Sequence, residues 1–233
     1  LPVRKPDLRT TRDFWREAVA LAGNKLAVVD REQGLSYAQA NAQVMRIAAG
    51  LARLAGTSRP TVAVALPNCI EYYLLYWAVV RLGGVIVPLN PWLKADALPG
   101  VFANVRPDVL VVPSAKAAVV IEVAQGADVR SCIALAPGDD GLTPWDEVKN
   151  CGEEPPLEPL DEDALSIIMH TSGTTGVPKG AMMRHSDLLF NVMTTLNAHR
   201  FSGNDVHLLV NPMFHCTALY SSLPSAAYTR TPL

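Results

Sequence analysis

The chain has 233 residues, of which 49% are apolar and 18% are charged, with 20 Lys and Arg against 22 Asp and Glu. This balance is typical of a folded globular domain and argues against a disordered chain. A net charge of −2 supplies no basic field that could collect nucleic acid or anionic lipid, so any phosphate binding requires a local site. The expected partners are therefore small molecules.

Cysteine spacing and hydropathy exclude several further classes. The four cysteines form no Cys-x-x-Cys pair and have no His at metal-ligand spacing, so neither a zinc site nor a disulfide framework is expected. The longest apolar run, 72–88, is interrupted by Arg81 and is shorter than the ~20 residues of a membrane span. The first residues contain no stretch like a signal peptide, which predicts a cytoplasmic protein without stable membrane insertion.

Helices and strands alternate over the first 135 residues. The apolar spacing predicts helices at 11–22, from Ser36 to about Leu54, and at 72–82, 94–105 and 114–124, and strands at 26–30, 61–66, 85–87, 108–112 and 131–135. Thr11, Ser36 and Asn68 are the expected N-terminal caps, with Gln39 completing a capping box at Ser36. The alternation predicts an α/β fold with mostly parallel sheets flanked by helices.

The composition changes to Gly, Pro, Asp and Glu between 137 and 163, which predicts a connector. We therefore expect a first α/β subdomain at 1–163 and the beginning of a second at 164–233. In the second, the pattern predicts a strand at 165–169, a Gly/Thr/Ser loop, a short extended piece at 181–183, a helix at 186–198 and a strand at 206–210.

The loop after strand 165–169 is the most informative segment. Residues 171–180 read Thr-Ser-Gly-Thr-Thr-Gly-Val-Pro-Lys-Gly and contain three glycines, four hydroxyls and one lysine. Glycines let backbone N–H groups surround an anion, hydroxyls donate without adding charge, and a lysine supplies a mobile cation. The pattern predicts a loop that binds the triphosphate of ATP, with Lys179 neutralising charge and with contacts from Thr171, Ser172, Gly173, Thr174, Thr175, Gly176 and Lys179.

Two better-known phosphate loops do not fit this segment. A Walker A loop requires Gly-Lys followed by Ser or Thr, whereas Gly176 is followed by Val-Pro and Lys179 by Gly180. A dinucleotide fingerprint requires a Gly-x-Gly element that opens directly into a helix, which is absent here.

The segment instead resembles the signature Thr-Ser-Gly-Thr-Thr-Gly-x-Pro-Lys-Gly of the AMP-forming acyl-activating enzymes. That superfamily includes acyl-CoA synthetases, firefly-type luciferases and peptide-synthetase adenylation domains. Residues 34–37, 66–68 and 83–91 also resemble stretches of its N-terminal domain. The resemblance runs from about Phe14 to the end of the chain and favours the acyl-CoA synthetases.

Four further residues are candidates for the site or its surroundings. Residues 212–215, Pro-Met-Phe-His, resemble the family's Pro-x-Phe-His element, which implies that Phe214 and His215 line the acyl pocket; a buried aromatic beside a surface His is the alternative. His185 resembles the family's His after the loop and is expected to cap the following helix rather than take part in catalysis. His170 is expected to pack against the loop.

The resemblance implies a two-step reaction with ATP, Mg²⁺ and coenzyme A. A carboxylic acid would react with ATP to give acyl-AMP and pyrophosphate, and the acyl group would then pass to coenzyme A. The family's adenine- and ribose-binding segments, acidic metal ligand and adenylation lysine have no counterpart before Leu233, so the isolated chain is expected to lack turnover. An adenylation domain of a peptide synthetase and a non-catalytic module that keeps the nucleotide loop are the alternatives.

Overall fold

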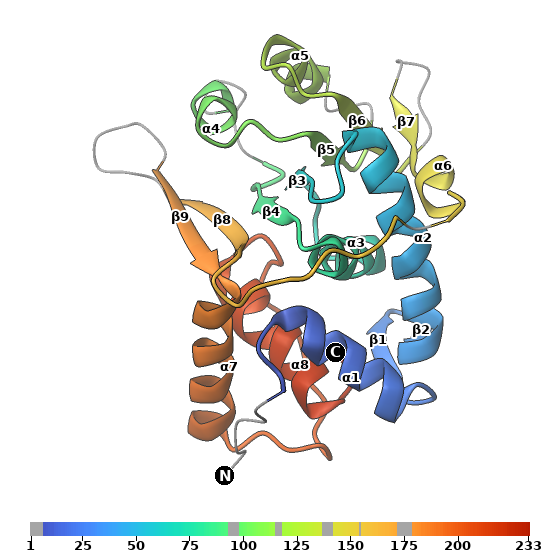
Figure 1. Ribbon diagram of the computed structural model, residues 1–233, viewed down its shortest axis with the longest axis vertical. Helices are drawn as coiled ribbons and strands as arrows, with labels where there is room; N and C mark the ends of the chain where they lie inside the picture. The colour runs from blue at the N-terminus through green and yellow to red at the C-terminus, as the bar shows by residue number, and fades with distance from the viewer. Residues whose placement is uncertain (1–6, 93–97, 115–117, 137–141, 154, 172–178) are drawn as a thin grey trace.

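A seven-stranded sheet, parallel except at one edge, forms the centre of the fold (Figure 1). The computed structural model describes residues 7–92, 98–114, 118–136, 142–153, 155–171 and 179–233. Its strand order is β7-β6-β5-β3-β4-β8-β9, and only β9, at the edge, runs antiparallel to its neighbour. The strands are β3 (Thr61–Val64), β4 (Val85–Pro88), β5 (Val109–Val112), β6 (Ser131–Ala134), β7 (Thr143–Pro144), β8 (Leu165–Thr171) and β9 (Lys179–Arg184).

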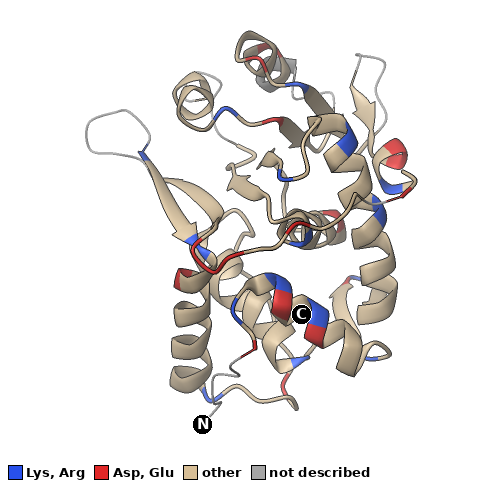
Figure 2. Ribbon diagram, in the orientation of Figure 1, with Lys and Arg blue, Asp and Glu red and all other residues tan. Residues whose placement is uncertain are grey.

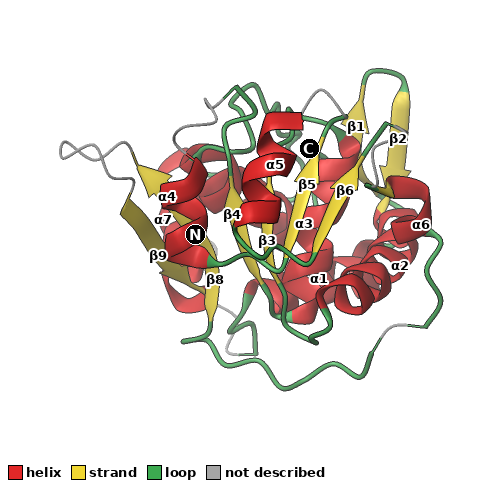
Figure 3. Cartoon of the chain, turned by 90° about the horizontal axis from the view of Figure 1, so that it is seen from above, coloured by secondary structure: helices red, strands yellow, loops and turns green. Residues whose placement is uncertain are grey.

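Helices cover both faces of this sheet, as Figures 1 and 3 show. The helices are α1 (Thr11–Ala22), α2 (Tyr37–Ala55), α3 (Ile70–Leu82), α4 (Leu98–Val105), α5 (Ala118–Gly126), α6 (Trp145–Lys149), α7 (His185–His199), the π-helix η3 (Thr217–Ser222) and α8 (Leu223–Thr229). The predicted α/β fold with a mostly parallel sheet is therefore confirmed.

Alternation of side chains along the central strands creates two separate cores. On β3, Val62 and Val64 belong to the large core with α1, α2 and α3, whereas Ala63 belongs to the smaller core with α4 and α5. A strand buried on both faces reads as a continuous apolar run, which is why 61–66 was recognisable in the sequence. Arginine and acidic residues are interspersed along α1 (Figure 2).

A second, small sheet lies beside the large core. Strand β1 (Leu26–Asp30) pairs antiparallel with β2 (Gln33–Ser36). On the other side of β1, the amide of Leu233 donates to Ala27 at 3.1 Å and its carbonyl accepts from Val29 at 2.8 Å. The C-terminal residue of the sequence therefore lies in a strand-like position against β1.

Two predicted helix caps, Thr11 and Asn68, are wrong. The side chain of each forms a hydrogen bond with a residue that is distant in the sequence. Thr10, not Thr11, is the N-cap of α1, and its hydroxyl and amide exchange hydrogen bonds with Asp13. Cys69, not Asn68, is the N-cap of α3 and forms no side-chain cap. The predicted capping box at Ser36 does form, with Gln39. Local pattern cannot distinguish a cap from a long-range hydrogen bond, because the same side chains make both.

The predicted strand at 206–210 is also wrong. This segment belongs to no helix or strand, although His207 N–H donates to the carbonyl of Pro232 at 2.9 Å. Val206, Leu208 and Val210 are 74%, 87% and 75% exposed. The largely apolar run at 206–210 is typical of a strand, but no neighbouring strand within the described residues pairs with the segment.

The proposed boundary near residue 163 falls within one continuous sheet. Strand β8, which follows the connector, pairs parallel with β4 through Ile86 and Ile167. Part of the connector forms β7 and α6, and α6 packs on α2. The division into two subdomains stays a prediction. Among the described residues, no helix has the length and apolar character needed to cross a lipid bilayer.

The contact between α2 and α6 predicts the effect of a single methyl group. A Cβ at Gly50, in the middle of α2, would lie 2.6 Å from the carbonyl oxygen of Val148 and 2.9 Å from its Cγ1. We expect Gly50→Ala to destabilise the protein by about 1–3 kcal/mol in urea unfolding, although alanine is the better helix former. Gly126→Ala, at the end of α5 where no atom lies within 4 Å, is the control and should not destabilise. Equal stability of the two variants would contradict this packing.

Candidate functional site

The predicted phosphate loop connects two paired strands. Thr171, the last residue of β8, lies opposite Lys179, the first residue of β9. The predicted contact residues Ser172, Gly173, Thr174, Thr175 and Gly176 lie outside the described residues. Lys179 is exposed, so its ammonium group is available at the end of the hairpin from which the loop leaves. The two ends of the loop are thus held side by side by strand pairing.

A glycine is required next to Lys179 by close packing across the hairpin. Gly180 lies opposite His170, and a Cβ at Gly180 would lie 2.8 Å from Cγ2 of Ile168 and 3.4 Å from Nε2 of His170. Because a β-branched side chain has little freedom at χ1, Ile168 could not move aside easily. Gly180 therefore lets β9 approach β8 closely at the base of the loop.

His170 lies at the base of the loop without polar contacts of its own among the described residues, and its predicted packing against the loop falls outside them. Neither ring nitrogen has a hydrogen-bond partner among the described residues, and the ring is half-buried. Burial lowers the pKa of His170 below its ordinary value, which favours the neutral imidazole at pH 7.

Phe214 and His215, the other predicted site residues, lie at the edge of the sheet where β8 leads into the loop. Parallel strands β3, β4 and β8 place their carboxyl ends together, and open α/β sheets bind ligands at that edge. Trp92 follows β4, and its ring lies 5.8 Å from that of Phe214 in an edge-on arrangement. Phe214 is 8% exposed, whereas His215, whose ring centroid lies 4.9 Å away, is exposed.

Asn68 is a contact residue that sequence reasoning missed. Its side chain accepts a hydrogen bond from the amide of Met213 and donates one to the carbonyl of Asn211. The sequence predicts Asn68, in the Leu-Pro-Asn tripeptide, only as a helix cap. A partner 145 residues away leaves no signal in the local pattern.

His185 is a structural residue at the start of α7. It is fully buried, and its Nδ1 accepts from the amide of Thr11 and lies 2.8 Å from the hydroxyl of Thr11. Asp187 rather than His185 caps the helix, because its Oδ2 accepts from the amide of Arg184 at 2.9 Å. Burial, reinforced by the charge of Arg12, lowers the pKa of His185 to about 4. A neutral, enclosed imidazole of this kind ties α7 to α1.

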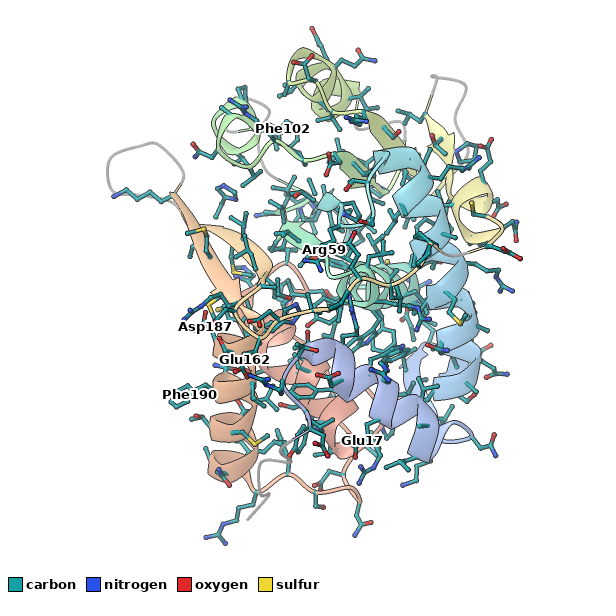
Figure 4. The ribbon with its side chains drawn as sticks, in the orientation of Figure 1. Glu17, Arg59, Phe102, Glu162, Asp187 and Phe190 are labelled. Carbon is teal, nitrogen blue, oxygen red and sulfur yellow. The ribbon has the colours of Figure 1, made fainter. Side chains whose placement is uncertain are left out.

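The junction of β9 and α7 is held by charge pairs. Arg184 forms ion pairs with Asp187 at 3.2 Å and with Asp163 at 3.0 Å. Figure 4 shows Asp187 in the first turn of α7, next to the hairpin. Asp163 is the last residue of the connector, so these ion pairs join the connector to β9, the strand that carries Lys179. The cluster is largely exposed, so each pair contributes little to stability.

A family comparison identifies the kind of protein that carries this arrangement. The model of the AMP-binding enzyme family matches residues 15–229. The chain belongs to this family. The match includes the hairpin that bears Lys179, Asn68 with its hydrogen bonds to 211 and 213, and the segment around Phe214.

Two curated relatives of this chain are CoA ligases. Crotonobetaine/carnitine–CoA ligase of Escherichia coli is 27% identical over 235 residues, and the enzyme of the same name from Escherichia fergusonii is 28% identical. Each comparison covers 93% of this chain but 45% of the relative, so the chain spans about half the length of the curated relatives that it matches.

Solved structures of similar proteins share the fold. ATP-bound MatB from Rhodopseudomonas palustris superposes with a TM-score of 0.81 and 26% identity, covering 95% of this chain and 44% of that one. The apo structure of MbtA from Mycobacterium smegmatis gives a TM-score of 0.87 and 27% identity, covering 96% and 43%.

Burial of His185 predicts a pH dependence of folding. Below its unfolded pKa of about 6.5, the unfolded chain binds a proton at this position that the folded protein excludes until about pH 4. Stability should therefore be complete above pH 6.5 and fall by about 3 kcal/mol as the pH is lowered to 4. Urea unfolding from pH 7.5 to 4 should show a flatter profile for His185→Asn than for the wild type.

The exposed His199, at the end of α7, supplies the control for this measurement. His199→Asn should keep the wild-type profile. A His185→Asn profile parallel to that of the wild type would show that His185 does not contribute to the pH dependence.

Proposed function

We propose that this chain provides the triphosphate-binding part and one wall of the acyl pocket of an AMP-forming acid–thiol ligase, acting in the cytoplasm. The observation that carries this proposal is the match of the AMP-binding enzyme family over 15–229, with Thr171 and Lys179 paired at the two ends of the signature loop. The complete reaction is proposed for the complete product of the gene, because the chain spans about half of its curated relatives.

The hairpin suits the first chemical step. A carboxylate oxygen of the acid would attack the α-phosphorus of ATP, forming a P–O bond while the bond to pyrophosphate breaks and the electron pair leaves with pyrophosphate. Little covalent work falls on the protein, which must align the reactants and neutralise the leaving charge. We assign Lys179 to that neutralisation, and Thr171 with 172–176 to contacts with the phosphates.

The cosubstrates Mg²⁺ and coenzyme A belong to this proposal through the family alone. When bound, Mg²⁺ would neutralise phosphate charge. The described residues contain no group of three or more His, Cys, Asp or Glu side chains that could hold a metal ion, so none of them is assigned as a metal ligand. In the second step, the thiol of coenzyme A would replace AMP on the acyl carbon.

The Phe214 segment suits the acid. Phe214 is buried beside Trp92 and presents His215 at the carboxyl edge of the sheet. We propose that Phe214 and His215 contact the acyl group. We also propose that the second subdomain, which contains both residues, begins at residue 164.

Two other functions make different predictions. An adenylation domain of a peptide synthetase would depend on an amino acid, whereas the curated relatives named above are CoA ligases. Pyrophosphate exchange with aliphatic acids, aromatic acids and amino acids in turn separates these two. A non-catalytic module would bind nucleotide and give no exchange with any acid.

Lys179 provides the direct test. We expect Lys179→Ala to weaken binding of ATP to this chain by roughly 10- to 150-fold in calorimetric titration, because a hydrogen bond to a charged group contributes about 1.5–3 kcal/mol. In the complete gene product, the same change should lower acid-dependent pyrophosphate exchange.

The control is Lys25→Ala, another exposed lysine, which precedes β1 and lies outside the hairpin. It should leave both measurements unchanged. Equal ATP affinity of Lys179→Ala and the wild type would contradict the assignment of the loop, and so would an equal loss in both lysine variants.

A further inference from the structure

The side chain of Asn68 joins two segments that are distant in sequence. Asn68 lies between β3 and α3, and its Oδ1 accepts from the amide of Met213 at 2.6 Å while its Nδ2 donates to the carbonyl of Asn211 at 3.0 Å. The side-chain amide of Asn68 thus forms hydrogen bonds with the residue before Pro212 and with the residue after it. This two-point contact fixes the orientation of the 211–213 backbone as well as its distance.

The segment that Asn68 holds has no regular structure of its own. Residues 204–210 belong to no helix or strand, and 211 and 212 continue this irregular path. Strand pairing therefore cannot set the position of Met213 within the described residues. The side chain of Met213 is 3% exposed and packs in the large core, so the backbone tether and the buried side chain act at the same residue.

The residues that directly follow the tether are the proposed acyl contacts. Phe214 comes one residue after Met213 and packs edge-on against Trp92 at 5.8 Å. Its ring lies 4.9 Å from that of His215. Asn68 and Trp92, from the ends of two neighbouring strands, thus bracket the Phe214 segment. A small rotation at Met213 would displace both proposed contact rings.

An amide is the side chain that this position requires. The site offers one backbone donor and one backbone acceptor, and a neutral amide satisfies both at once. A carboxylate would keep the bond from Met213 but could not donate to the carbonyl of Asn211. The Asn68 amide makes these long-range hydrogen bonds although α3 begins two residues later without a side-chain cap.

We propose that Asn68 is a positioning residue for the acyl pocket, which holds Phe214 and His215 at the carboxyl edge of the sheet without touching the acid itself. This inference rests on the proposed function, because the pocket is part of that proposal. Asn68 acts on the acid side of the reaction, since its two hydrogen bonds go to 211 and 213 rather than to the hairpin of Lys179.

The first experiment tests the tether in this chain, independently of any activity. Amide hydrogen exchange followed by NMR should show the Met213 amide at least 10-fold faster in Asn68→Ala than in the wild type, with the amides of β3 unchanged. Asn68→Asp, which keeps the acceptor, should fall between the two. Asn197→Ala, an exposed asparagine of α7, is the matched control and should leave Met213 unchanged. An unchanged Met213 amide in Asn68→Ala overturns the tether.

The second experiment tests the positioning role in the complete gene product. Hexanoate and benzoate are the probes, and the one that supports faster pyrophosphate exchange in the wild type is used. Asn68→Ala should raise the KM for that acid at least 5-fold and leave the KM for ATP within 2-fold, with Asn68→Asp again intermediate. A purely structural defect would instead lower kcat or affect both substrates alike.

The outcomes of the two experiments separate this inference from the proposed function. Faster exchange at Met213 with an unchanged KM for the acid overturns the positioning role but leaves the ligase function intact. Absence of exchange with every carboxylic acid in the wild type overturns the proposed function and the acid-binding role together, while the hydrogen exchange result still decides the tether.

Discussion

Burial of α3 on almost every side is the constraint on which the rest of the structure depends. Eleven of its 13 residues are buried, because it lies between the sheet and the helices α1 and α2. Trp77 stacks on Trp15 of α1 with ring centroids 4.7 Å apart. The indole N–H of Trp77 and the hydroxyls of Tyr72 and Tyr76 have no partner among the described residues, a cost that only the extensive apolar burial offsets. A helix enclosed in this way cannot rotate or shift, so the loop before it is fixed as well.

The sequence predicted those elements in which local pattern and tertiary packing agree. The limits of α1, the capping box of α2 at Ser36 and the end of α3 at Leu82 all follow from such patterns. The prediction failed where a side chain serves a distant partner, as Asn68 does. It also failed at 206–210, because an apolar run does not show whether a neighbouring strand lies alongside.

The candidate site was predictable from the sequence only in its chemical parts. Glycines, hydroxyls and Lys179 occur together in one short segment, so their chemistry is visible without a structure. The pairing of Thr171 with Lys179, the edge-on contact of Trp92 with Phe214 and the contact of His185 with Thr11 join residues from different elements. His185 shows the consequence: the family resemblance drew attention to it, yet its complete burial makes it a tie between helices.

The two halves of the proposed site share one framework. Strand β8, which leads to the Lys179 hairpin, pairs with β4; Trp92, which contacts Phe214, follows that same strand β4. Asn68 leads into α3, and α3 ends just before β4 begins. The proposed nucleotide side and the proposed acid side are therefore both attached to the β3–α3–β4 unit, in which α3 has eleven of its 13 residues buried. Because alignment within fractions of an ångström controls such reactions, a buried unit common to both proposed sides would let the protein core, rather than either loop, set the distance between acid and phosphate.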